Sequence, residues 1–79
     1  MAQYKYGKFL SQVSADTDAY DVIWNPGSQP INSGIYRCVG CGREVVGEKE
    51  RTLPPQNHHQ HTPVQGLIRW LLVVFAQGI

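Results

Sequence analysis

The sequence has few charges, two cysteines and no long apolar run. Charged residues make up 16% of the chain and the formal net charge is +1, so the charge does not indicate a nucleic acid or an anionic membrane as a partner. The longest apolar stretch, residues 67–76, is interrupted by Arg69 and is far shorter than the roughly 20 residues of a membrane span. The first residues lack the apolar run of a secretory signal, so we expect a cytoplasmic protein.

The small size of the chain favours a stabilising element such as a bound metal. With 79 residues we expect a single domain over residues 1–79, and domains of this size bury a modest fraction of their surface and tend to need a metal, disulfides or a partner. The apolar fraction of 42%, with eight aromatic residues, is nevertheless typical of a folded chain. In a reducing compartment, two cysteines separated by two residues indicate a metal or redox site before a structural disulfide.

Two strands are predicted in the first third of the chain. Residues 3–10 begin with alternating aromatic and basic side chains, which favours a strand. Residues 20–24 place Tyr20, Val22 and Trp24 at a period of two. The tetrapeptide Asn-Pro-Gly-Ser at 25–28 then has the composition of a turn, so this second strand should end at Trp24.

A hairpin and an apolar segment are predicted in the rest. Residues 35–38 are β-prone and should pair with a return strand at 45–46, with the tip at 39–42. Residues 67–76 fit a strand better than a helix, although periodicity cannot decide between the two in so continuous an apolar run. Both faces of such a strand would be apolar apart from Arg69, so we expect either a central strand covered by the segment of Tyr4, Tyr6 and Phe9 and by the loops, or the contact of a homodimer.

The strongest signal is the stretch Cys38-Val39-Gly40-Cys41-Gly42 at the predicted hairpin tip. Two cysteines at this spacing can direct both thiolates at one ion, and Gly42 permits the backbone conformation that turns amide N–H groups toward the sulfurs. The pattern predicts half of a zinc site, because structural zinc is bound by four ligands.

The histidines are the candidates for the other two ligands. All three, His58, His59 and His61, are separated from Cys41 by 16 to 19 intervening residues, which is close to the separation of the two halves of a zinc ribbon. His58 with His61 would repeat the spacing of the cysteines, whereas His59 with His61 would share one face of an extended segment. His58 with His59 is the least favoured pair, because adjacent side chains on an extended backbone diverge.

Other interpretations of these residues remain open. The cysteines could form a redox pair, although no helix pattern follows them to lower a thiolate pKa, or a plain reduced pair. The histidines could belong to a polar surface loop between prolines.

Four stretches carry a resemblance to known proteins: DVIWNPG at 21–27, SGIYRCVGCGRE at 33–44, LPPQNHHQH at 53–61 and IRW at 68–70. Together with the Tyr-Lys-Tyr start, they resemble a small bacterial family of unknown function labelled protein L, which is distinct from the immunoglobulin-binding protein of that name. More distantly, the chain resembles zinc ribbons whose second knuckle reads Leu-Pro-Pro-Cys-x-x-Cys-Gly-His. In that register Gln56 and His59 replace the two cysteines, and this difference favours His59 with His61 as ligands.

These observations predict a small β-rich, mostly antiparallel, zinc-ribbon-like domain with long loops. We expect Zn²⁺ bound by Cys38, Cys41 and two of the three histidines, and a role as a protein interaction module without enzyme activity. One rival is an open-site zinc enzyme or metal sensor with three protein ligands, in which Glu44 would act as a base. Another is a weak binder of single-stranded nucleic acid through Tyr36, Trp70 and the arginines, which the low net charge disfavours.

Overall fold

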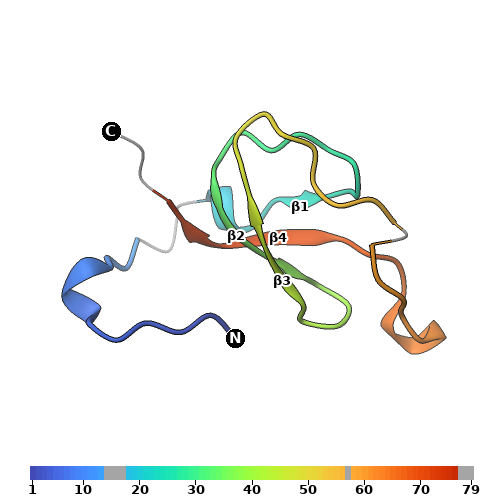
Figure 1. The fold of residues 1–79 in the computed structure, drawn as a ribbon, viewed down its shortest axis with the longest axis horizontal. Helices are drawn as coiled ribbons and strands as arrows, with labels where there is room; N and C mark the ends of the chain where they lie inside the picture. The colour runs from blue at the N-terminus through green and yellow to red at the C-terminus, as the bar shows by residue number, and fades with distance from the viewer. Residues whose placement is uncertain (14–17, 57, 77–79) are drawn as a thin grey trace.

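The fold is a four-stranded antiparallel sheet with strand order β1-β4-β2-β3, shown in Figure 1. The computed structural model describes residues 1–13, 18–56 and 58–76. The strands are β1 (Ile23–Trp24), β2 (Gly34–Cys38), β3 (Glu44–Gly47) and β4 (Trp70–Phe75), and three 3-10 helical turns are η1 (Gly7–Phe9), η2 (Asp18–Tyr20) and η3 (Pro63–Gln65). This architecture confirms the predicted small β-rich, zinc-ribbon-like fold with long loops.

The predicted hairpin is formed by β2 and β3. Ile35 pairs with Val46 and Tyr36 with Val45, as the two β-prone runs indicated. Alternate residues of β2 are buried, so Tyr36 and Cys38 point to the same side of the sheet. The hairpin therefore places Cys38, the first cysteine, in the core.

The apolar segment near the C-terminus forms the central strand β4, which lies between β1 and β2 (Figure 1). This confirms a strand over a helix and places it inside the sheet, where its backbone can pair on both sides. Its buried face joins that of β2 and is covered by loop residues, so that the core consists of Tyr36, Cys38, Leu53, Ile68, Trp70 and Leu72.

The predicted N-terminal strand is wrong. Residues 3–10 contain the turn η1 and pair with no strand among the residues that the structure describes. Tyr4, Tyr6 and Phe9 are 70%, 54% and 74% exposed, so they do not cover β4 as expected. A strand requires a partner strand, and the contacts of this segment include local ones: the rings of Tyr6 and Phe9 meet edge to face, and Lys8 lies over both.

The second predicted strand is shorter than expected. Only Ile23 and Trp24 belong to β1, whereas Tyr20 ends the turn η2 and lies near the ring of Phe75 in β4. The turn after Trp24 is confirmed, since Ser28 N–H donates to the Asn25 carbonyl at 3.1 Å and Gly27 has a φ of 80°.

Two backbone hydrogen bonds attach this turn to the loop that carries the histidines. Gly27 N–H donates to the Leu53 carbonyl, and Leu53 N–H donates to the Ser28 carbonyl at 2.8 Å. The side chain of Leu53 is 1% exposed, so the start of the histidine segment is anchored in the core. None of the helical turns in the described parts of the chain is long or apolar enough to cross a membrane.

Candidate metal centre

The two cysteines lie on a tight knuckle, residues 38–43, at the end of β2. Gly42 N–H donates to the Cys38 carbonyl at 2.8 Å, and Cys38 N–H donates to the Arg43 carbonyl at 2.7 Å. Gly42 has a φ of 83°, a conformation that side chains with a Cβ rarely adopt. The backbone conformation of the knuckle is therefore determined by its local sequence, as predicted.

The histidines lie on a second segment, the histidine loop, residues 53–56 and 58–61. After the buried Leu53, the Pro54 carbonyl accepts a hydrogen bond from Trp70 Nε1 at 3.4 Å. Gln56 Oε1 accepts one from Ile68 N–H at 2.9 Å, so the residue that stands in place of a zinc-ribbon cysteine connects the loop to the segment before β4. These contacts place the loop beside the knuckle.

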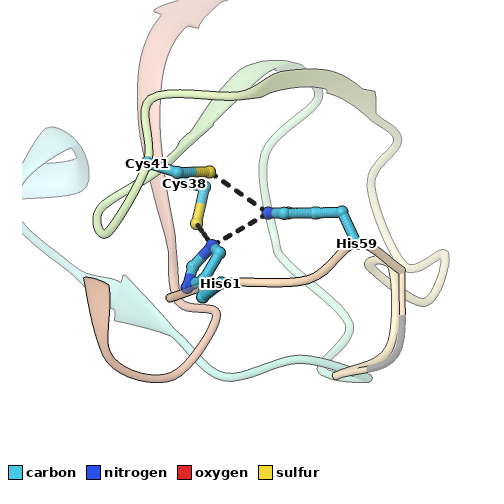
Figure 2. A group of neighbouring side chains, drawn as sticks. All are labelled: Cys38, Cys41, His59 and His61. Carbon is cyan, nitrogen blue, oxygen red and sulfur yellow. Dashed lines mark hydrogen bonds between the residues drawn. The ribbon is translucent and has the colours of Figure 1, made fainter. Parts of the chain in front are cut away.

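Four side chains from the knuckle and the loop converge, as Figure 2 shows: Cys38, Cys41, His59 and His61. We call them the Cys2His2 group. Cys38 Sγ lies 3.3 Å from His61 Nε2, and Cys41 Sγ lies 3.2 Å from His59 Nε2. The two Nε2 atoms are 3.0 Å apart. All four ligand atoms lie within 4.8 Å of one another, so the group could hold a metal ion.

The group extends from the core to the surface. Cys38 is fully buried, the two histidines are half-buried, and Cys41 is exposed. A pocket of about 320 Å³ opens beside the histidines and is lined by Gln56, His59, Gln60, His61, Gly66 and Ile68. An ion in the group would thus be shielded on the side of the sheet and close to solvent on the other.

The protein environment favours the metal-binding form of Cys38. Burial raises the pKa of its thiol, but backbone N–H groups of Cys41, Gly40 and Arg69 and the side chain of Cys41 outweigh this effect and leave the pKa below its ordinary value. These donors stabilise the thiolate, which is the form that binds metals. This matches the sequence-based expectation that amide groups of the knuckle face a sulfur.

The environment also favours the neutral form of His59. Burial lowers the pKa of its imidazole, and the charges of His61, Arg43 and His58 lower it further. Because only the neutral ring has a free nitrogen lone pair, this shift leaves His59 able to bind a metal.

Of the two favoured histidine pairs, the structure brings His59 and His61 to the cysteines. His58 lies beside the Cys2His2 group, with its Nδ1 2.8 Å from Nδ1 of His59. The contact that orients His61 was not expected from the sequence: its Nδ1 lies 2.8 Å from the Gly66 carbonyl oxygen. Its signal is the pattern Thr-Pro-Val-Gln-Gly at 62–66, in which Thr62 and Gln65 form a capping box around η3.

The fold and the Cys2His2 group define a small β-rich domain of zinc-ribbon-like architecture. The chain is 45% identical over 76 residues to "Protein L" of Escherichia coli, an alignment that covers 94% of this chain and 86% of the relative. The chain therefore belongs to the same family as this protein. No model of a protein family matches the chain, and no solved structure does.

Proposed function

We propose that this protein is a zinc-binding domain in which the ion stabilises the fold, and that the domain acts as a protein interaction module. The observation that carries the zinc site is the convergence of the Cys2His2 group, whose ligand atoms come from segments 18 to 23 residues apart and lie within 4.8 Å of one another. Around a tetrahedral Zn²⁺, ligand atoms would lie roughly 3.3–3.8 Å apart, given Zn–S and Zn–N distances of about 2.3 and 2.0–2.1 Å. In the structure three of these separations are 3.0, 3.2 and 3.3 Å, at or just below this range, and all four ligand atoms lie within 4.8 Å of one another.

The donor set supports zinc over other ions. Two thiolates and two imidazoles suit Zn²⁺, whereas Mg²⁺ and Ca²⁺ prefer oxygen ligands. Among the described residues, no Asp or Glu is part of the group. A site with two thiolates also requires reduced cysteines, which supports the cytoplasm as the compartment.

A structural role is favoured over catalysis because four protein ligands leave no open position on a tetrahedral ion. The rival, an open-site enzyme or sensor, would use three ligands and the pocket beside His59 and His61. It would also need a base, and Glu44 is outside the group of four, at the start of β3 opposite Arg37. X-ray absorption of the zinc-loaded protein separates the two, since we expect two sulfur and two nitrogen ligands and no bound water.

The interaction role draws support from the exposed apolar side chains. The N-terminal segment and the end of β4 form an apolar cavity of about 650 Å³, lined by Phe9, Leu10, Ser11, Val13, Val74, Phe75 and Ala76. Exposed apolar surface of this kind is typical of contacts with another protein or a second copy of the chain. Sedimentation at high micromolar concentration tests the homodimer, which a monomer would exclude.

Nucleic-acid binding through Tyr36 and Trp70 is disfavoured, since both side chains are 0% exposed and cannot stack on bases. The central test of the proposal is metal content, measured by mass spectrometry on protein purified without chelator or nickel. We expect about one zinc per chain. Protein that is folded and free of metal would contradict the proposal.

A further inference from the structure

We infer that His58 is a positioning residue that holds the imidazole of His59 in the tautomer able to bind the ion. This inference rests on the proposed zinc site. It concerns one contact, the 2.8 Å separation between Nδ1 of His58 and Nδ1 of His59.

A similar contact at Nδ1 of His61 shows how a partner determines which ring nitrogen carries the proton. Nδ1 of His61 lies 2.8 Å from the Gly66 carbonyl oxygen, and a carbonyl can only accept. The proton of the neutral ring is therefore on Nδ1 of His61, which leaves the lone pair on Nε2. That is the atom that His61 presents to Cys38 and to His59. The Gly66 carbonyl thus fixes this tautomer.

His59 presents Nε2 to the group in the same way, so it needs an acceptor at its own Nδ1. No backbone carbonyl within the described residues fills this position, and Nδ1 of His58 does. Two facing nitrogens form a hydrogen bond only when one carries the proton and the other does not. With Nε2 of His59 toward the ion, His59 Nδ1–H donates and His58 Nδ1 accepts, so the proton of His58 is on Nε2.

Trp70 holds His58 in the orientation that this bond requires. The indole lies edge to face with both imidazoles, with ring centroids 6.0 Å from His58 and 5.9 Å from His59. The side chain of Trp70 is fully buried and its Nε1 donates to the Pro54 carbonyl, so the surface against which the two rings pack is fixed. His58 itself is exposed, and its Nε2 has no place among the ligand atoms.

The test compares two substitutions of His58. One keeps a hydrogen-bond acceptor without the ring, and the other keeps an aromatic ring without the acceptor. His58→Asn keeps an acceptor, because Oδ1 of asparagine is as many bonds from Cα as Nδ1 of histidine. His58→Phe keeps an aromatic ring against Trp70 but has no acceptor. Zinc affinity is measured by competition with a chromophoric chelator, and the tautomer of His59 by the nitrogen chemical shifts of its imidazole in NMR.

We expect His58→Phe to lose roughly 10–100-fold in zinc affinity, as is usual when the partner of a metal-bound histidine is removed. His58→Asn should stay within a few-fold of the wild type. In the zinc-loaded wild type, His59 should carry its proton on Nδ1, with a hydrogen-bonded N–H that His58→Phe loses.

An unchanged affinity in His58→Phe would overturn the inference, and so would an equal loss in both variants, because the acceptor would then make no difference. If the wild type bound no zinc at all, the proposed function itself would fail. Zinc binding by the wild type with no effect of His58→Phe would remove the role of His58 alone.

Discussion

Cys38 and Trp70 stand opposite each other in the ladder between β2 and β4, and both side chains are fully buried. Cys38 is the innermost member of the Cys2His2 group, while the indole of Trp70 packs against His59. The pairing of Cys38 with Trp70 thus positions one ligand of the knuckle. It also positions the indole against which the histidine loop packs. The geometry of the site and the register of the sheet therefore depend on each other.

Removal of the ion or of a cysteine should unfold the protein. Metal binding and folding are one equilibrium when the ligands come from distant segments, and structural zinc contributes about 10–16 kcal/mol in small domains. We expect a chelator, Cys38→Ser or Cys41→Ser to abolish the cooperative melting transition seen by circular dichroism. Val39→Ser, an exposed change between the two cysteines, is the matched control and should melt like the wild type. A metal-free protein with an unchanged melting curve would show that the ion is incidental.

The histidines should differ in their effect on zinc affinity. His59→Ala and His61→Ala should each weaken binding by roughly 100-fold or more, because each removes one of four ligands that share the binding free energy. Gln60→Ala changes the exposed residue between them and should leave the affinity unchanged. Titration with a competing chelator measures all three. Full affinity in His59→Ala would mean that His58 or water completes the site.

Gly40→Ala should destabilise the protein through the contact between knuckle and loop. An added Cβ would lie 2.4 Å from the Gln65 carbonyl oxygen and 2.9 Å from Cε1 of His61, so the backbone of one segment would have to move. We expect a loss of about 1–3 kcal/mol in the free energy of unfolding of the zinc-loaded protein, as is usual for overpacking.

The sign of the change in unfolding free energy for Gly40→Ala tests whether this contact is present. Gly40 is not among the glycines with positive φ, so without the contact an alanine would stabilise the chain by about 0.4–1 kcal/mol. Val39→Ala, a change at an exposed position of the knuckle, is the control. A stabilised Gly40→Ala protein would place the knuckle and η3 farther apart than the structure shows.

Acidification should release zinc and destabilise the fold together. The folded protein lowers the pKa of both Cys38 and His59, so the unfolded chain binds more protons over the range between the lowered and the ordinary values. The stabilisation from each group is complete above its ordinary pKa and is lost as the pH falls through its lowered pKa. Bound zinc adds a positive charge to the site and acts in the same direction.

For His59, this loss begins below pH ~6.5, the ordinary value of an imidazole. Melting temperature and bound zinc, followed at constant ionic strength from about pH 8 to about pH 5, should fall in parallel. Loss of zinc with a constant melting temperature would contradict the coupling of metal and fold.

Local sequence was sufficient to predict the knuckle and the hairpin. The spacing of Cys38 and Cys41, the glycine at 42 and two short β-prone runs act over a few residues, so the backbone conformation there follows from near neighbours. The composition of residues 67–76 likewise favoured a strand over a helix but left open whether a central position in the sheet or a second copy of the chain would cover it. The structure places residues 70–75 between β1 and β2, with Trp70 and Leu72 buried.

Only the tertiary structure decided whether the N-terminal segment forms a strand and which histidines lie at the cysteines. Residues 3–10 have strand composition, but β-propensity depends on the tertiary context of a segment, and among the described residues this segment pairs with no strand of the sheet. The position of His59 and His61 at the cysteines depends on the burial of Leu53, the packing on Trp70 and the hydrogen bond from His61 to Gly66. These contacts join residues that are distant in sequence, and no short-range pattern encodes them.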